Sequence, residues 1–171
     1  NGKPIVAAPH IREALEPFFQ KYPDVVLDGE LYNHDLKDNF EKIVSLVRKT
    51  KPTAEDLEES KELVQYHVYD CLIDDVFYVR NNILENWVDG FFEHVHLVKT
   101  VPIHDEHDIV TMLGHYLEQG YEGQMLRVMD SLYEGKRSKN LIKHKEFEDA
   151  EYKIVSIEEG KGNWAGAAKR V

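Results

Sequence analysis

The 171-residue sequence contains one cysteine, Cys71, and therefore cannot form an internal disulfide framework. It has no apolar run near the roughly 20 residues that a membrane-spanning helix requires. Residues 1–4 also lack the layout of a signal peptide. A lone cysteine suits a reducing compartment. We therefore expect a cytoplasmic protein that is monomeric and has no membrane partner.

Positive charge is also scarce, because 32 Asp and Glu residues outnumber 21 Lys and Arg residues and give a net charge of −11. An acidic surface repels the phosphates of nucleic acid. The charge is unevenly distributed, however, since residues 134–171 contain nine Lys and Arg against seven Asp and Glu. Local charge governs association more than the total does. The composition therefore neither favours nor excludes a polynucleotide partner.

Hydrophobic periodicity divides the sequence into helical and extended segments. Apolar residues at a spacing of three or four predict helices at residues 9–22, 77–92 and 105–120, and two more that begin near Asp38 and Thr53. Val-rich or alternating segments predict strands at residues 25–32, 64–72, 95–101, 122–128, 141–146 and 151–158. Several strands follow one another without regular βαβ alternation. This order predicts an α+β fold with largely antiparallel sheets and flanking helices.

Local signals refine these boundaries. Pro17 is expected to bend or interrupt the first helix, and Asp38 is expected to cap the second. Gly120 is expected to end the last helix. The acidic segment 146–151 is the expected hinge between two domains, and residues 160–166 are expected to form a loop.

Four short motifs follow one another along the chain. They are residues 27–32 (Leu-Asp-Gly-Glu-Leu-Tyr), 66–70 (Tyr-His-Val-Tyr-Asp), 122–127 (Glu-Gly-Gln-Met-Leu-Arg) and 143–145 (Lys-His-Lys). Carboxylates can hold a metal or a ribose, an aromatic ring can stack on a base, and lysines neutralise phosphate. Each motif alone is usually a turn, a core aromatic or a solvated lysine pair. The combination in this order predicts a nucleotide site.

Strand alternation predicts how these side chains are directed. It places Asp70 on the strand face opposite to Tyr69, and it places Lys143 and Lys145 on a common face. We expect one pocket to be surrounded, from strands of a single sheet, by Glu30, Tyr69, Glu122, Lys143 and Lys145.

As a set, the motifs resemble those of the covalent nucleotidyltransferases, specifically the ATP-dependent DNA ligases of small phage or bacterial type. Residues 138–145 (Ser-Lys-Asn-Leu-Ile-Lys-His-Lys) are similar to the family's fifth motif, and residues 149–151 (Asp-Ala-Glu) resemble its hinge into an OB-fold domain. The resemblance implies the ligase adenylation (nucleotidyltransferase) fold, which is ATP-grasp-like, over residues 1–147. Residues 148–171 would form the hinge and the first strands of an OB-fold β-barrel.

The resemblance also implies an activity. The parent protein would seal nicks in double-stranded DNA, in repair, replication and recombination, with ATP and Mg²⁺ as cofactors. A lysine attacks the α-phosphate of ATP, the covalently bound AMP moves to a 5′-phosphate, and a 3′-hydroxyl then displaces the AMP. Attack on phosphorus places negative charge on phosphate oxygens, which cations must offset.

Individual residues receive roles from the same resemblance. Glu122 would bind Mg²⁺, and Glu30 would contact the ribose hydroxyl or a metal-bound water. Tyr69 would stack on adenine. Lys143 and Lys145 would hold the α-phosphate, and Arg137 would face the nucleotide.

The family's nucleophile motif, Lys-x-Asp-Gly, does not occur in the 171 residues. Lys3 and Lys21 are the only lysines before Asp28, and neither has an Asp-Gly context. We therefore expect a ligase segment whose nucleophilic lysine precedes Asn1 and which alone cannot form an enzyme adenylate. The alternatives are an RNA ligase, a GTP-using mRNA-capping guanylyltransferase, or a non-catalytic nucleotide-binding or interaction segment.

Nine histidines raise a separate question, because His94 and His96 share a strand face and His104 and His107 follow closely. Zinc sites need three or four ligands with fixed partners. No further cysteine and no His-Glu-x-x-His motif accompany these histidines. We interpret them as solvated or core residues.

Overall fold

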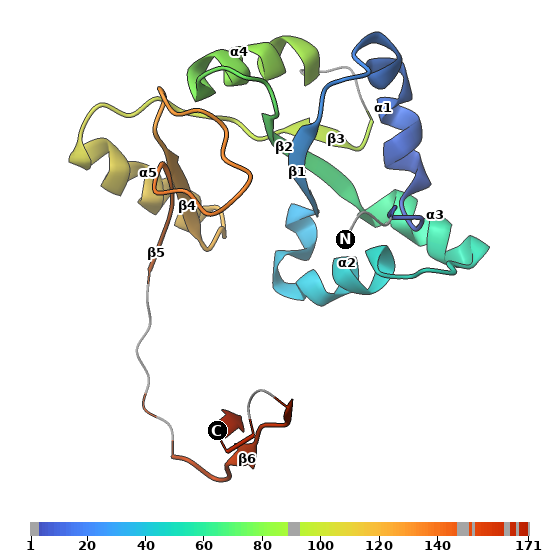
Figure 1. Ribbon diagram of the computed structural model, residues 1–171, viewed down its shortest axis with the longest axis vertical. Coiled ribbons are helices and arrows are strands. Elements are labelled where there is room, and N and C mark those ends of the chain that lie inside the picture. Colours follow the sequence, from blue (N-terminus) through green and yellow to red (C-terminus); the bar gives the residue numbers. More distant parts are fainter. Residues whose placement is uncertain are drawn as a thin grey trace.

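The computed structural model describes residues 4–88, 93–146, 151, 153–162, 165–166 and 168–170. Its helices are α1 (Pro9–Lys21), the 3₁₀ helix η1 (His34–Asn39), α2 (Phe40–Val47), α3 (Ala54–Leu63), α4 (Phe77–Val88) and α5 (Glu106–Glu118). Its strands are β1 (Leu27–Tyr32), β2 (Gln65–Cys71), β3 (Val95–Leu97), β4 (Gly123–Arg127), β5 (Leu141–Lys145), β6 (Glu158–Glu159) and β7 (Ala168–Arg170). Figure 1 shows their arrangement.

The strands form three small sheets, as expected for an α+β fold. In the first sheet β2 is central, antiparallel to β1 and parallel to β3. The antiparallel pairs β4–β5 and β6–β7 make the other two. The prediction that the candidate residues lie on one sheet is wrong, because β4 and β5 form a separate sheet with α5 packed against β4. That unit lies beside the first sheet (Figure 1).

The hydrophobic core lies around the first sheet. Its members come from α1, α2, α4, the end of α3 and the sheet itself, and include Ile11, Leu15, Ile43, Leu46, Val64, Val68, Leu84, Val88 and Val95. Burial of such side chains supplies the main driving force for folding, at about 25 cal/mol per Å² of apolar surface. The first sheet is therefore backed by a packed core, which can hold candidate side chains in place.

Two of the predicted helix starts are confirmed at atomic detail. Thr53 and Asp56 form a reciprocal capping box at the start of α3, and the Asp105 side chain accepts a hydrogen bond from the Asp108 amide at the start of α5. Gly120, at φ +84, follows the end of α5 as expected. Glycine adopts this left-handed conformation without steric cost.

Other boundary predictions are wrong. Pro17 is expected to bend or interrupt the first helix; α1 is not interrupted at Pro17. The residue that caps α2 is Asn39 instead of Asp38, with no side-chain hydrogen bond. β3 ends at Leu97 instead of continuing to Val101. Of the strand predicted at residues 151–158, only Glu158 at its end belongs to a strand within the described residues.

Three expectations concern residues outside the described ranges. Phe91, predicted to complete the fourth helix, is one of them. The expected hinge at 146–151 and the expected loop at 160–166 are each described only in part. Within the described residues, no helix combines the length and apolarity needed to cross a membrane.

Gly29 lies where β1 and β2 approach closely. A Cβ atom at this position would meet the His67 carbonyl oxygen at 2.5 Å and the Tyr66 ring at 2.7 Å. We therefore expect Gly29→Ala to lower the free energy of unfolding by about 1–3 kcal/mol, as overpacking does. A Cβ atom at Gly114, in α5, would meet nothing within 4 Å, and Gly114→Ala should instead stabilise by about 0.5–1 kcal/mol. Urea unfolding of both variants measures the contrast, and equal effects would contradict the close approach at Gly29.

Candidate functional site

A β-bulge in β2 determines which way the aromatic motif points. Asp28 pairs with Asp70, but the next residue, Gly29, pairs with Val68, so that Tyr69 is an extra residue in β2. Bulges of this kind redirect side chains. Residues directly opposite in an antiparallel pair point to the same face. Asp70 therefore lies on the same face of the sheet as Asp28. The prediction that regular alternation places Asp70 and Tyr69 on opposite faces is wrong.

The two strands thus present one polar face, which faces away from the core. The same register places Glu30 opposite His67 on the side of Asp28 and Asp70. We call this the polar face; its residues are Asp28, Glu30, His67, Tyr69 and Asp70. The opposite side carries core residues such as Leu27 and Leu31.

The second sheet also has two distinct faces. Met125 pairs with Lys143 and Gly123 with Lys145, so these side chains share a face with Arg127, two residues along β4. We call this the basic face; its residues are Met125, Arg127, Lys143 and Lys145. The opposite face packs on α5, where the Gln124 side chain donates to the Ile109 carbonyl at 2.8 Å.

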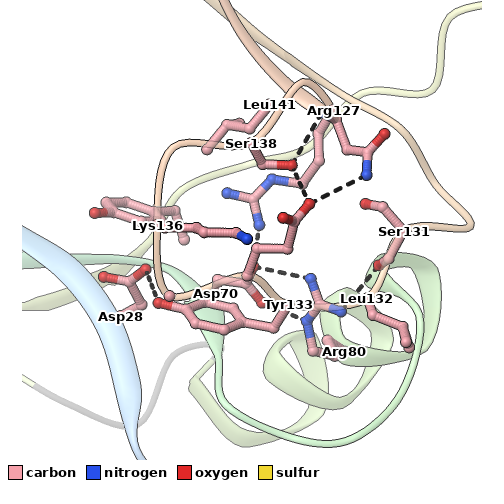
Figure 2. Close-up of a pocket in the computed structure, with 14 residues that line it drawn as sticks. Asp28, Asp70, Arg80, Arg127, Ser131, Leu132, Tyr133, Lys136, Ser138 and Leu141 are labelled. Atoms are coloured by element: carbon pink, nitrogen blue, oxygen red, sulfur yellow. Dashed lines mark hydrogen bonds and ion pairs between the residues drawn. The ribbon is translucent and has the colours of Figure 1, made fainter.

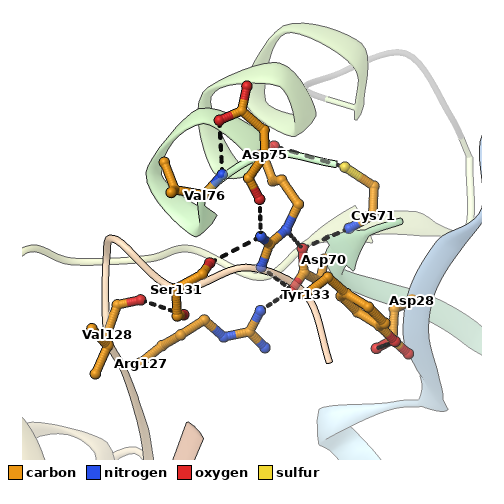
Figure 3. A network of polar contacts seen from close by, with 10 residues as sticks. Asp28, Asp70, Cys71, Asp75, Val76, Arg127, Val128, Ser131 and Tyr133 are labelled. Carbon is orange, nitrogen blue, oxygen red and sulfur yellow. Dashed lines mark hydrogen bonds and ion pairs between the residues drawn. The ribbon is translucent and has the colours of Figure 1, made fainter. Parts of the chain in front are cut away.

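The basic face is turned toward the polar face. An Arg127 guanidinium nitrogen forms an ion pair with Asp70 Oδ2, and the same guanidinium lies 4.3 Å from the centre of the Phe77 ring. Figure 3 shows Arg127 reaching from its strand to Asp70. The two sheets, although separate, therefore bring the second, third and fourth motifs of the sequence together.

Arg80 of α4 connects the segments that meet at this junction through its hydrogen bonds. Its side chain is almost fully buried and donates to both Asp70 carboxylate oxygens, at 2.8 and 3.1 Å. It also donates to the carbonyls of Asp75, at 2.5 Å, and Ser131, at 3.1 Å. A buried guanidinium is tolerated only when it is paired and hydrogen-bonded in this way. Arg80 thus joins β2, the loop before α4 and the loop after β4.

A pocket of about 250 Å³ lies next to this network, whose residues form part of its lining. Its walls are Asp28, Tyr69 and Asp70 on one side and the loop between β4 and β5 on the other (Figure 2). Across the pocket, the Tyr133 hydroxyl donates to Asp28 Oδ2 at 2.8 Å. Burial, followed by the neighbouring Asp28 carboxylate, raises the pKa of Tyr69 to about 12. Tyr69 is therefore a neutral aromatic ring at ordinary pH, partly exposed at the pocket wall.

Glu122, just before β4, lies beside Lys143 of β5. Lys143 Nζ donates to Glu122 Oε2 at 3.1 Å, and both side chains are exposed. This hydrogen bond, with the charges of Lys143 and Lys145, holds the pKa of Glu122 below its ordinary value. Glu122 is therefore a carboxylate at neutral pH, beside two ammonium groups.

The sequence-predicted residues are only partly brought together. Tyr69 lines the pocket, whereas Glu30, Glu122, Lys143 and Lys145 do not. Arg137 is exposed on the loop between β4 and β5, flanked by the pocket residues Lys136 and Ser138.

Sequence reasoning missed several residues that shape the site. Met125 and Arg127 belong to the third motif, and strand alternation from Lys143 and Lys145 would have placed them on the same face. Arg80 and Tyr133 had no such signal. Their partners, Asp70 and Asp28, lie 10 and 105 residues away in the sequence.

No three His, Cys, Asp or Glu side chains within the described residues converge as metal ligands. His94, considered above for zinc, instead lies against His10, with ring centres 5.0 Å apart. His67 and His96 are neighbours on the first sheet, with ring centres 5.1 Å apart. Burial, followed by the charges of His96 and His34, lowers the pKa of His67 to about 4.

Comparison with known proteins gives consistent relatives. The DNA ligase of Enterobacteria phage T4 is 37% identical over 79 residues, which cover 46% of this chain and 16% of that protein. The DNA ligase of Haemophilus influenzae is 24% identical over 168 residues, which cover 96% of this chain and 59% of that protein. The chain therefore spans less than two thirds of the length of either relative.

A solved structure described as "DNA binding with a minimal scaffold: Structure-function analysis of Lig E DNA ligases" superposes with a TM-score of 0.71 at 27% identity. The match covers 88% of this chain and 58% of that one. The Chlorella virus DNA ligase-adenylate, at 22% identity and a TM-score of 0.54, shares the fold over 83% of this chain and 54% of its own. The sequence profile of the family described as "ATP dependent DNA ligase domain" matches residues 1–145. The chain therefore belongs to the family of ATP-dependent DNA ligase domains.

Proposed function

We propose that this chain binds ATP and Mg²⁺ between the polar face and the basic face, and that the parent protein seals nicks in double-stranded DNA. The observation that carries the proposal is the Asp70–Arg127 ion pair, because it turns the lysine-bearing sheet toward the strand that carries Tyr69. A base-stacking ring and two phosphate-binding cations are thereby presented from opposing faces.

Each part of the nucleotide has a suitable partner in this arrangement. The neutral Tyr69 ring would stack on adenine, a contact worth about 1–3 kcal/mol. Met125, an exposed apolar side chain on the basic face, would contact the other side of the base. Glu30 would accept a hydrogen bond from the ribose. Lys143 and Lys145 would neutralise the α-phosphate.

The carboxylates present fit magnesium. Mg²⁺ prefers oxygen ligands and is usually held by one or two carboxylates together with substrate phosphates and waters. Glu122 and Glu30 are exposed and therefore accessible to such an ion. A bound Mg²⁺ would offset charge on the phosphate oxygens. Lys143, which is paired with Glu122, would contact phosphate through the same ammonium group.

The residues of this chain would bind and orient the nucleotide, whereas the nucleophile would come from elsewhere. An attacking lysine needs a lowered pKa, because the ordinary pKa of a lysine side chain is near 10.4 and the ammonium cannot attack. Lys21 is an exposed residue at the end of α1, beside the Tyr22 ring. We therefore assign the attack to a Lys-x-Asp-Gly segment of the parent protein.

The remaining assignments follow from the same proposal. Residues 1–147 would form the adenylation domain, and residues 148–171 the hinge and first strands of an OB-fold domain. Arg137, together with Lys136 and Lys139 on the exposed loop between β4 and β5, would face the nucleotide or the DNA backbone. The parent protein would act as a cytoplasmic monomer.

The alternatives predict different ligands. An RNA ligase would seal nicked RNA, and a capping guanylyltransferase would prefer GTP to ATP. A non-catalytic binding segment would hold a nucleotide but give no covalent adduct in any combination. The family match favours the DNA ligase.

Radiolabelled ATP tests the proposal. Incubated with Mg²⁺ and labelled ATP, the purified chain should carry no label after denaturing electrophoresis. Label should appear, and nicked duplex DNA should be sealed, once a segment carrying Lys-x-Asp-Gly is fused before Asn1 or added in trans. Labelling of the chain alone would mean that one of its own lysines is the nucleophile. A fused protein that is labelled only by GTP, or that seals only RNA, would favour an alternative.

A further inference from the structure

A second junction between the two sheets lies at the other end of β4. His34, the first residue of η1, lies two residues after the end of β1. Its ring stacks on Tyr121, with centres 4.3 Å apart and an interplanar angle of 29°. Its Nε2 donates to the Gln119 carbonyl at 2.9 Å, and its Nδ1 accepts from the Tyr32 hydroxyl at 2.8 Å.

The position of His34 is itself fixed. The neighbouring Asn33 is buried, and its side-chain amide donates to the Leu63 carbonyl at 2.9 Å. The oxygen of the same side chain accepts from the Asp35 amide at 3.0 Å, which caps η1. Asn33 therefore fixes the start of η1 to the end of α3, and with it His34, against which the turn at residues 119–122 packs.

The turn that His34 contacts leads directly into Glu122. Tyr121 is the residue before Glu122, and its amide donates to the Tyr116 carbonyl at 3.0 Å at the end of α5. Lys37 of η1 lies against Gly120 in the same turn. Tyr32 lies two residues after Glu30 in β1, and its ring centre is 6.1 Å from that of His34, which stacks on Tyr121. The ends of β1 and β4 that carry Glu30 and Glu122 thus meet around Tyr32 and His34.

We propose that His34 is a positioning residue, which holds the turn at residues 119–122 against the end of β1 and thereby sets Glu122 relative to Glu30 for binding of a magnesium–nucleotide complex. The inference rests on the proposed function, since it concerns the carboxylates assigned there to the metal.

The geometry of β4 explains why a second junction is needed. β4 runs from Gly123 to Arg127, and Arg127 is fixed at its far end by Asp70. Five residues of extended chain span roughly 14 Å. The contacts with Asp70, Arg80 and Asp28 all lie at the Arg127 end of β4 or in the loop that follows it, so that without a second junction Glu122 would lie at the unsupported end of the strand. The stack of His34 on Tyr121 fixes that end. Its loss should therefore displace Glu122 most and Arg127 least.

The test compares His34→Ala, Tyr121→Ala and Tyr121→Phe in the complete 171-residue chain. ATP affinity is measured by calorimetry over a range of Mg²⁺ concentrations and again in EDTA. Loss of a residue that orients a metal ligand typically weakens metal binding by about tenfold or more. His34→Ala and Tyr121→Ala should therefore raise, about tenfold, the Mg²⁺ concentration that produces half of the increase in ATP affinity. ATP affinity in EDTA should change less than about twofold. Tyr121→Phe keeps the stack and should behave as the wild type.

Hydrogen exchange gives a readout that needs no nucleotide. The Tyr121 amide should exchange faster in His34→Ala than in the wild type, whereas the β4 amides near Arg127 should be unaffected. His107→Ala, an exposed histidine in the first turn of α5, is the matched control and should change neither measurement.

The outcomes separate the two proposals. A wild-type chain that bound no ATP would refute the proposed function and this inference with it. If the wild type binds ATP and His34→Ala shows the same Mg²⁺ dependence as the wild type, the inference alone is refuted. An equal loss of ATP affinity with and without Mg²⁺ would also overturn it, because that result indicates general disruption. Melting temperatures of all variants identify any that fail to fold, and where one of the two alanine variants does, the other carries the test.

Discussion

Asp70→Ala is expected to lower the free energy of unfolding by about 3–5 kcal/mol, the usual cost of breaking a buried ion pair by removing one partner. The Asp70 carboxylate accepts hydrogen bonds from two guanidinium groups and from the Cys71 amide. Its removal would leave the almost fully buried Arg80 without a counter-charge. Urea unfolding, followed by circular dichroism, measures the loss.

Two controls make this result specific. Glu59→Ala removes an exposed partner of Lys42 and should cost less than about 1 kcal/mol. Asp70→Ala combined with Arg80→Ala should cost less than the sum of the two single changes, because residues in one network are coupled. Additive losses, or an Asp70→Ala variant as stable as Glu59→Ala, would mean that the junction contributes little to the fold.

Lys143→Ala and Lys145→Ala are each expected to weaken ATP binding by about tenfold, equivalent to about 1.4 kcal/mol. A charge contact at about 4 Å with an effective dielectric of about 20 is worth about 4 kcal/mol, but Lys143 is exposed and solvent screens it. Adenosine has no phosphate, so its affinity should not change. In a protein with the nucleophile restored, both changes should reduce adenylate formation more strongly, because the cations act on charge that develops during the reaction.

Lys99→Ala provides the matched control, since Lys99 is an exposed lysine after β3 that belongs to neither face. Tyr69→Ala should weaken ATP and adenosine alike, by about 1–3 kcal/mol of lost stacking. Calorimetry with both ligands distinguishes these patterns. Equal and negligible losses for Lys143→Ala, Lys145→Ala and Lys99→Ala would show that the lysine pair is ordinary surface charge.

Local sequence signals were enough to locate most of the helices and strands. Thr53 and Asp105 start their helices where capping chemistry predicts, because an N-cap depends on residues only three positions apart. The effect of Pro17 was not predictable locally, because its helix is supported by core packing of Ile11 and Leu15, which outweighs a local penalty. Packing of this kind is set by residues distant in the sequence.

The candidate site was predictable as a set of residues but not as a surface. Regular alternation is broken at Tyr69 by a bulge that depends on the partner strand, so the direction of Asp70 could not be read from β2 alone. Lys143 and Lys145 do share a face, as period-two alternation requires. Arg80 was missed because nothing in its own helix indicates a buried guanidinium, which becomes apparent only when Asp70 and Ser131 are brought beside it.

The central claim, that ATP lies between the polar face and the basic face, can be tested most directly by photoaffinity labelling with 8-azido-ATP. Peptide mapping of the labelled chain should place the azidoadenine on residues 65–71 or 123–127, which carry Tyr69 and Met125. Excess ATP should abolish the label, and Lys143→Ala should reduce it. Label confined to other peptides, or label that ATP does not displace, would contradict the account.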